Sequence, residues 1–319
     1  MRVLGYIALT LAMAVAAPAH ARYPERPITL LVPFAPGGAN DIVGRIIGDA
    51  LGEALGQPVV IENRGRAGGN IGMGIVARAK PDGYTLLLAP SSFVINPSLQ
   101  KTVPYDPIKD FAPISELTYF VVALTVAADS DIDSVAKLIT RIKEKPGTFS
   151  YGTPGTGTQS HLVGEQIKQR TGIDMVHVPY AGAGPAAQAV LGHILPLAIV
   201  SLSVATPLIN AGRLRGLAVT GRERWPDLPN VPTLQEAGLP DVTSESWQGI
   251  LAPAGTPPEI VERLVKELTA ILRRPDIRAK LRQAGFAATG GGSDALRARI
   301  AEELPRWREV IEKAGLKRD

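Results

Sequence analysis

The sequence predicts an α/β protein in which mostly parallel sheets are flanked by helices. Short apolar runs recur along the chain, and four of them are followed by a glycine-rich turn and then by a segment with helical periodicity. Such units follow one another from residue 28 to residue 89, and the same order returns from residue 149 to residue 191. Alternating strands and helices of this kind favour a doubly wound parallel sheet.

The first unit joins a buried strand to an amphipathic helix. Residues 28–32 are apolar and bounded by prolines, which is typical of a strand covered on both faces. From residue 42 to residue 55, apolar side chains recur at three- and four-residue spacing, as in a helix with one buried face. The turn between them contains Gly37 and Gly38, which let the backbone approach a ligand, and the first amides of a helix favour an anion. A single glycine pair is equally consistent with a tight connection between strand and helix. However, the chain repeats such glycine-rich turns, which favours ligand binding.

The rest of the first half continues the pattern. We expect a strand at 59–61, a helix that buries Ile71, Ile75, Val76 and Ala79, and a strand at 84–89. A polar turn at 90–93 follows that last strand, and ligands gather at the carboxyl ends of strands in open α/β sheets. After a proline-rich loop at 99–113, the long strand 114–128 is expected to cross into a second domain.

The second half repeats these units and then returns. We expect strands at 149–151, 175–179, 195–201, 216–220 and 244–252, and helices at 131–145, 159–170, 185–191, 204–211, 257–272, 275–283 and 293–314. The segment 221–240, rich in proline and charge, is interpreted as a linker back to the first domain. Two crossings create a hinge. The predicted domains are 22–122 with 223–319, and 123–222.

The N-terminal residues predict export. Arg2, an apolar run at 3–15 and the small-x-small sequence Ala19-His20-Ala21 form the three regions of a secretory signal peptide. We expect cleavage after Ala21 and a soluble periplasmic protein. The apolar run is shorter than a bilayer-spanning helix, and no later segment offers a span. The absence of cysteine excludes disulfides.

Composition and motif spacing argue against several other classes. The formal charge of +4 comes from interspersed residues, which does not indicate nucleic-acid binding but suits an anionic ligand. Ser91 or Ser92 with His161 or His177 would be needed for a serine hydrolase, but the chain has no GxSxG elbow. Histidines at metal-ligand spacing are missing, and the glycines at 65–72 follow a polar segment, so neither a metal nor a dinucleotide cofactor is predicted.

A set of motifs in a fixed order gives a more specific indication. The chain contains PFAPGGAND, ENRGRAGGNIG, AKPDGYTLL, PYDPIKDFAPI, YGTPGTGTQSHLVGE, VPYAGAGPA and LAPAGTP. With these motifs it closely resembles the Bug family of periplasmic substrate-binding receptors of tripartite tricarboxylate transporters. The resemblance implies a two-domain type II periplasmic binding protein of the Venus-flytrap kind. It also implies a non-catalytic monomer that closes over a small carboxylate and serves transporter membrane subunits or, alternatively, a signalling partner as a sensor.

The resemblance also implies a set of ligand-binding residues, taken position by position from these motifs. They are Phe34, Pro36, Gly37, Gly38, Asn40, Ser91 and Ser92 in the first domain, and Thr156, Gly157, Thr158, Tyr180, Ala181 and Gly182 in the second. Asp41 is interpreted as support for the helix start, because a carboxylate facing an anionic ligand would repel it.

Two positions depart from the family pattern. Val200 stands in or near a position that is usually acidic, so a ligand ammonium would lose a partner there. Thr153-Pro154 replaces a more usual serine and small residue before the glycine turn. We therefore expect a carboxylate without an amino group. Transport receptor, sensor and exported serine hydrolase remain as three hypotheses that ligand binding and turnover would separate.

Overall fold

The computed structural model describes residues 23–316, except for 35, 37–38, 66 and 181. The strands are β1 (Ile28–Val32), β2 (Val59–Asn63), β3 (Thr85–Pro90), β4 (Phe111–Ala127), β5 (Phe149–Thr153), β6 (Met175–Pro179), β7 (Leu197–Ser201), β8 (Leu214–Val219), β9 (Glu245–Pro253) and β10 (Ala287–Gly291). The helices are α1 (Ala39–Leu55), the 3-10 turn η1 (Ala67–Gly69), α2 (Asn70–Ala77), α3 (Ser92–Leu99), α4 (Val135–Glu144), α5 (Gln159–Thr171), α6 (Ala183–Leu191), α7 (Leu202–Asn210), α8 (Pro258–Arg273), α9 (Pro275–Gln283) and α10 (Ser293–Lys313).

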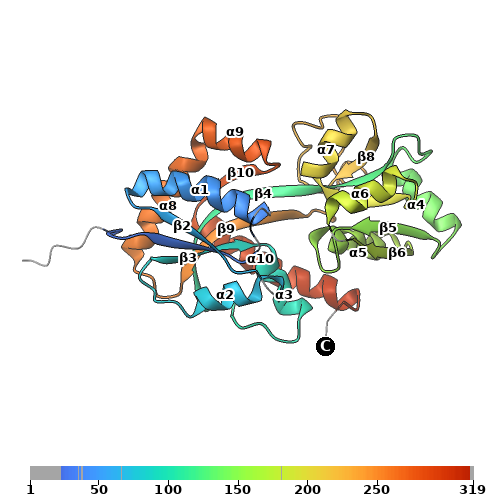
Figure 1. The fold of residues 1–319 in the computed structure, drawn as a ribbon. Helices are drawn as coiled ribbons and strands as arrows, with labels where there is room; N and C mark the ends of the chain where they lie inside the picture. The colour runs from blue at the N-terminus through green and yellow to red at the C-terminus, as the bar shows by residue number, and fades with distance from the viewer. Residues whose placement is uncertain (1–22, 35, 37–38, 66, 181, 317–319) are drawn as a thin grey trace, which may run out of the picture.

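The strands form one continuous sheet that is shared by two lobes (Figure 1). Its order is β2-β1-β3-β9-β4-β7-β5-β6, and β8 and β10 also pair with β4. The pairs among β1, β2 and β3 are parallel, as are those of β5 with β6 and β7. We call the part with β1–β3, β9, β10, α1–α3 and α8–α10 the first lobe, and the part with β5–β8 and α4–α7 the second lobe. This is the expected α/β architecture, with antiparallel strands added at its centre.

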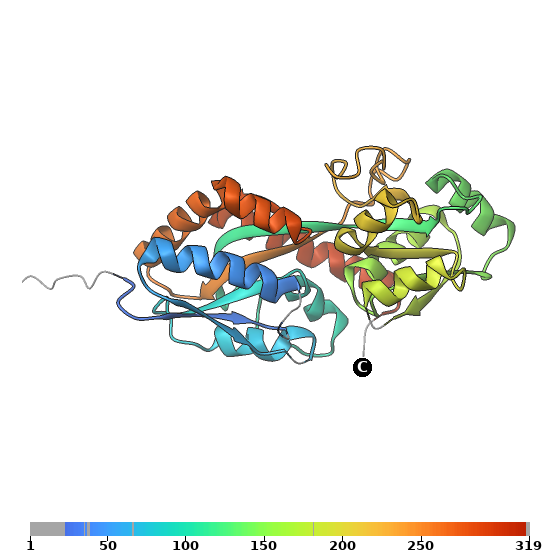
Figure 2. The same ribbon diagram turned by 45° about the horizontal axis from the view of Figure 1, so that its top comes forward.

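Strand β4 connects the lobes (Figure 2). Its first part pairs with β9, up to Val121 opposite Glu245, and its second part pairs with β7 and β8 from Val122 onward. At the same level the Thr220 amide donates to the Val122 carbonyl, and the Ser244 amide donates to the Thr220 carbonyl, at 3.0 and 2.9 Å. Two chain segments, β4 and the start of β9, therefore cross between the lobes where a hinge was predicted, and Thr220 of the second lobe lies beside them.

Each lobe buries apolar side chains on both faces of its sheet. In the first lobe, α1, α8 and α9 cover one face and α2, α3 and α10 cover the other. In the second lobe, α4 and α5 pack on one face and α6 and α7 on the other. This double covering explains why the inner strands β1, β3 and β7 are mostly apolar and buried. Within the described ranges, no helix combines the length and the apolar character that a lipid bilayer requires.

Helix α10 is fixed to the crossing strands by buried charges. The Arg299 guanidinium lies 2.7 Å from a Glu116 oxygen of β4, 3.3 Å from Glu245 of β9 and 3.1 Å from Glu303 of its own helix. Glu303 also accepts a hydrogen bond from the Trp247 indole at 2.9 Å. Burial raises the pKa of Glu116, and the positive charge of Arg299 opposes that rise. The cluster is paired throughout, so it holds the helix on the sheet near the hinge.

The predicted buried face of α2 is wrong at two positions, although Val76 is buried as expected. Ile71 and Ile75 are 45% and 40% exposed, whereas Gly72 and Met73 are buried. A Cβ atom on Gly72 would lie only 2.8 Å from Leu31 of β1. The helix backbone therefore packs directly on the sheet at Gly72, and hydrophobicity alone placed Ile71 and Ile75 on the buried face.

The segment 221–240 is not a simple linker. Trp225, Leu228 and Val231 are buried in the core of the second lobe that α6 and α7 cover. Leu234 and Leu239 enter its other core, and the chain leaves the lobe only at about Ser244. The division into domains remains a proposal, and this packing argues for a boundary near residue 243 rather than 222.

Candidate functional site

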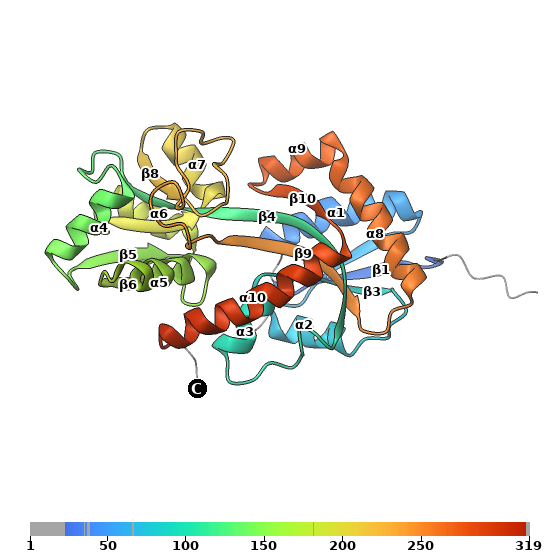
Figure 3. The same ribbon diagram turned by 180° about the vertical axis from the view of Figure 1, so that it is seen from behind.

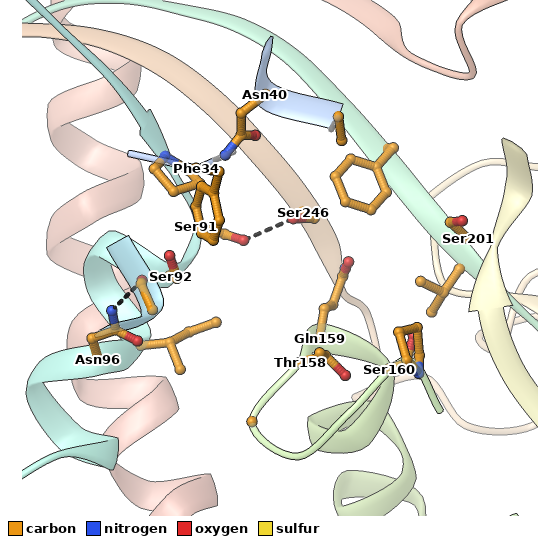
Figure 4. Close-up of a pocket in the computed structure, with 18 of the residues that line it drawn as sticks. Phe34, Asn40, Ser91, Ser92, Asn96, Thr158, Gln159, Ser160, Ser201 and Ser246 are labelled. Atoms are coloured by element: carbon orange, nitrogen blue, oxygen red, sulfur yellow. Dashed lines mark hydrogen bonds between the residues drawn. The ribbon is translucent and has the colours of Figure 1, made fainter. Parts of the chain in front are cut away.

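A cavity of about 900 Å³ lies between the lobes. It is bounded by residues that directly follow the carboxyl ends of parallel strands in both lobes: Phe34 after β1, Ser91 after β3 and Pro154 after β5, with Ser201 at the end of β7. Helices α1, α3, α5 and α7 start at the same places. Figure 4 shows polar side chains of the two lobes facing each other across this space. It is the crevice in which open α/β sheets bind ligands.

Hydroxyl groups line the first-lobe wall at the start of α3. The hydroxyls of Ser91 and Ser246 share a hydrogen bond of 2.7 Å, which ties the start of α3 to β9 (Figure 4). The neighbouring Ser92 hydroxyl is buried and has no hydrogen-bond partner among the described residues. An unsatisfied buried hydroxyl is costly, so a ligand oxygen at this position would stabilise it.

A chain of hydrogen bonds orients Asn40 at the start of α1. The Thr118 hydroxyl donates to Gln248 Oε1, and Gln248 Nε2 donates to Asn40 Oδ1, both at 2.5 Å. With its oxygen engaged in this way, Asn40 presents its amide nitrogen as a donor to the cavity. The two strands β4 and β9 therefore set the direction of a side chain that belongs to a helix.

A second amide network shapes the wall beside α3. Asn96 Nδ2 donates to Asn70 Oδ1 at 2.7 Å and to the Gly68 carbonyl at 2.9 Å, and Asn70 Nδ2 donates to Gln100 Oε1 at 2.6 Å. These bonds join α2 and η1 to α3. The network gives this wall a fixed shape, and it uses amide groups rather than charges.

The second-lobe wall is built by the glycine turn before α5. Thr158 caps the helix: its hydroxyl accepts from the His161 amide at 3.4 Å and donates to the Gly155 carbonyl at 2.7 Å. The Gly157 amide donates to His161 Nδ1 at 3.1 Å. Gln159 Nε2 donates to Ser244 Oγ at 3.1 Å, and its Oε1 is buried without a partner among the described residues.

Two stacked histidines lie behind this turn. The rings of His161 and His177 are 3.8 Å apart and nearly parallel, and His177 Nε2 lies 2.7 Å from the Thr153 hydroxyl. Burial, with a smaller contribution from the positive charge of Lys168, lowers the pKa of His161 to about 4. Burial also lowers the pKa of His177 to about 4. Both rings are therefore neutral near pH 7, and neither is placed as part of a serine–histidine pair.

The electrostatic character of the cavity suits an anion. Among the described residues that line it, none is acidic, and Lys101 is the one charged side chain. Asp41 lies one residue beyond Asn40, but its carboxylate accepts from Arg45 at 2.9 and 3.0 Å and from Asn63 at 3.0 Å. With the partial positive ends of four helices nearby, the cavity favours a negative group.

The structure brings seven of the expected binding residues to the cavity wall: Phe34, Asn40, Ser91, Ser92, Thr156, Gly157 and Thr158. Pro36 is exposed and Gly182 precedes α6, and neither lines the cavity. Tyr180 packs against the core of the second lobe instead. Gly37, Gly38 and Ala181 lie outside the described residues. Contact between any of these residues and a ligand stays a prediction.

Other lining residues were missed from the sequence. They are mainly polar residues at helix starts and side chains on the crossing strands, including Asn96, Gln159, Ser160, Ser203, Ser246, Phe120 and Phe286. Gln159 and Ser160 could have been found, because they directly follow the predicted glycine turn. Phe120 and Ser246 could not, because the face of a strand that meets a cavity depends on its neighbours.

Comparison with known proteins identifies the family. Residues 43–316 match the family described as "Tripartite tricarboxylate transporter family receptor". The chain belongs to this receptor family. It is 35% identical to Protein BugT of Bordetella pertussis over 99% of this chain and 98% of that protein. The receptors of this family bind solutes and are not enzymes.

Solved structures agree with this assignment. The periplasmic binding protein BugD is 35% identical, with a TM-score of 0.76 over 93% of this chain and 100% of that one. Rpa4515 of R. palustris, solved with adipate, is 36% identical, with a TM-score of 0.79 over 92% of this chain and 98% of that one. MatC of Rhodopseudomonas palustris, solved with bound malate, is 30% identical, with a TM-score of 0.74 over 91% of this chain and 100% of that one. The receptor therefore has the periplasmic binding protein fold that the motifs implied.

Proposed function

We propose that this receptor captures a small organic carboxylate between its lobes and delivers it to the membrane subunits of a tripartite tricarboxylate-type transporter. The observation that carries the proposal is the cavity itself, where hydrogen-bond donors from two lobes surround a space whose described lining contains no acidic side chain. Relatives solved with adipate and malate support the ligand class. Each charge-assisted hydrogen bond to a carboxylate contributes roughly 1.5–3 kcal/mol, so neutral donors suffice.

The binding residues proposed here come from both lobes. Asn40, Ser91 and Ser92 would hold the ligand from the first lobe, and the turn that carries Thr156 and Thr158 would close from the second. Because binding then needs both walls, ligand affinity and lobe closure are coupled. Val200 is buried in the apolar core of the second lobe and does not line the cavity. The described lining has no acidic side chain to pair with a ligand ammonium, which supports a ligand without an amino group.

We also propose that residues 1–21 are an export signal that is cleaved after Ala21. The proposal rests on the charged, apolar and small-residue regions of the sequence and agrees with the periplasmic relatives. The N-terminal sequence of protein purified from a periplasmic extract would begin at Arg22. An intact N-terminus in that fraction would contradict cleavage.

Replacing Ser92 with aspartate tests the binding site. A carboxylate at this position would repel an anionic ligand, while the start of a helix tolerates aspartate well. We expect adipate or malate at 100 times its Kd to stabilise the unchanged protein by about 2.7 kcal/mol and so raise its Tm by several degrees. Ser92→Asp should abolish this rise.

Ser98→Asp is the matched control, since it makes the same change on the same helix at a residue that does not line the cavity. Thermal unfolding with a wider panel of carboxylates, including monocarboxylates, extends the test. The proposal fails if no carboxylate raises the Tm, or if both variants respond like the unchanged protein.

A further inference from the structure

One part of the cavity wall is apolar and directly adjoins the hydroxyl pair. Phe120 of β4 is paired with Ser246 of β9 in the antiparallel ladder, so both side chains lie on the same face of the sheet. Val122, two residues further along β4, faces the same way and also lines the cavity. The apolar wall therefore begins next to the Ser91–Ser246 hydrogen bond, where the donors of the first lobe are gathered.

The wall is completed by Phe286, which comes from the turn between α9 and β10. The rings of Phe120 and Phe286 meet edge to face, with their centres 5.7 Å apart and their planes at 89°. Phe286 is only 5% exposed, and Phe120 is half-buried, so the ring pair is held in place and turns one surface to the cavity. We call Phe120, Val122 and Phe286 the phenylalanine wall.

The phenylalanine wall offers no hydrogen bonds to a ligand. A carboxylate or hydroxyl placed against it would lose its water without gaining a donor, which is unfavourable. An apolar or aromatic group would instead bury its surface there and could meet the rings edge to face. Lys101 is the one charged residue among the described lining. It is exposed and follows α3, so it does not belong to the phenylalanine wall.

We propose that the ligand is a monocarboxylate with an apolar, ring-sized body. This inference rests on the proposed function and makes it more specific. The carboxylate lies at the starts of α1 and α3, near Asn40, Ser91 and Ser92, and the body packs against the phenylalanine wall. A compact, polar dicarboxylate would satisfy the donors but leave the wall without an apolar partner.

Calorimetric titration with four probes tests this assignment. Benzoate and hexanoate have one carboxylate and an apolar body, adipate has an apolar chain between two carboxylates, and malate is short and polar. We expect benzoate to bind at least about tenfold more tightly than malate, with hexanoate between them. Phe120→Ala should weaken benzoate binding about tenfold and change the Kd of malate less than about twofold.

Two further variants make the result specific. Phe149→Ala makes the same change at a half-buried residue at the start of β5, outside the cavity lining, and should alter neither Kd. Phe120→Leu keeps an apolar side chain, so it should retain part of the benzoate affinity and serves if Phe120→Ala does not fold.

The outcomes separate this inference from the function on which it rests. If adipate or malate binds most tightly and Ser92→Asp abolishes that binding, the proposed receptor function stands. The proposal that the ligand is an apolar monocarboxylate would then be wrong. Equal losses for all probes in Phe120→Ala would also overturn the inference, because they would show a general structural effect. If none of a wide carboxylate panel binds, both proposals fail.

Discussion

His161 lies behind the cavity and acts on it through the backbone. Its Nδ1 atom accepts from the Gly157 amide, so the neutral ring holds the glycine turn in shape. The groups around it are His177, Glu165 and Lys168, and the Glu165 carboxylate also accepts from the Tyr151 hydroxyl at 2.9 Å. A protonated ring would lose the acceptor for the Gly157 amide and place a charge in a buried site.

The stability of the protein should therefore fall at acid pH. The pKa of His161 is about 4 in the fold and 6.5 as the ordinary value, so the unfolded chain binds more protons between those values. The neutral ring therefore contributes fully to the free energy of unfolding above pH 6.5. This contribution is lost as the pH falls towards 4, and the loss is about 3 kcal/mol at most. His161→Asn keeps an acceptor and removes the titration, so its unfolding free energy should depend less on pH in this window.

Urea unfolding at pH 7, 5.5 and 4.5 gives the comparison. His193→Asn is the control, because His193 is exposed and its positive φ of 55° suits asparagine. It should keep the pH dependence of the unchanged protein. If His161→Asn loses stability with acid as steeply as the unchanged protein, the ring does not contribute to the acid sensitivity.

At the scale of single residues, the sequence predicted side chains that directly follow strands. Ser91 and Ser92 were expected at the cavity because a polar turn follows a buried strand, and that rule is local. Phe120 and Ser246 lie within strands, and which face of a strand meets a cavity depends on register with partners far away in sequence. The sequence therefore indicated the polar donors but missed the phenylalanine wall.

At the scale of elements, close packing of a helix on its strand requires glycine. In α5, Gly164 faces the buried Tyr151 of β5: a Cβ at this position would lie 2.7 Å from the Tyr151 hydroxyl and closer still to its ring. Tyr151 is held by its bond to Glu165, so it has little room to move. Gly164→Ala should lower the free energy of unfolding by roughly 1–3 kcal/mol.

Gly184→Ala in α6 should have the opposite sign. Among the described residues, no atom outside the adjacent helix backbone lies within 4 Å of a Cβ there, so alanine adds helix propensity without a clash and stabilises by about 0.5–1 kcal/mol. Chemical denaturation of the two variants measures both effects. If Gly164→Ala changed the free energy of unfolding as little as Gly184→Ala, the clash with Tyr151 would be relieved by a shift of helix α5 away from its strand.

Element prediction succeeded where a pattern was long and failed where packing overrode it. The long strand β4 and the helices α8 to α10 were expected because apolar residues recur over many positions. Helix α3 was not expected, since it is short and contains Pro97. The buried face of α2 was misjudged at Ile71 and Ile75 because Gly72, which adds no hydrophobicity to the pattern, meets the sheet.

At the scale of the whole molecule, the lobes touch on both sides of the cavity. On one side, Gly157 of the second lobe lies against Leu99 of α3, and on the other Gly285 of the first lobe lies against Ser203 of α7. Behind the hinge, α10 extends beneath α5, where Gln169 donates to the Val310 carbonyl at 3.2 Å (Figure 3). The described arrangement is thus one in which the lobes have come together.

A side chain at Gly157 should hold the lobes apart. A Cβ there would lie 2.6 Å from Leu99 across the lobe boundary, and the residue has a φ of 77°. Gly157→Ala should therefore favour a more open molecule, with a larger radius of gyration in small-angle scattering without ligand and a carboxylate affinity reduced about tenfold. Gly172→Ala provides the matched control. Its φ is 67°, so it carries a similar backbone cost, but within the described part of the chain no atom beyond its own neighbours lies within 4 Å of a Cβ there. Because Gly157→Ala and Gly172→Ala carry a similar backbone cost, they differ only in the clash with Leu99. Equal scattering curves for the two variants would show that contact at Gly157 does not govern closure of the lobes.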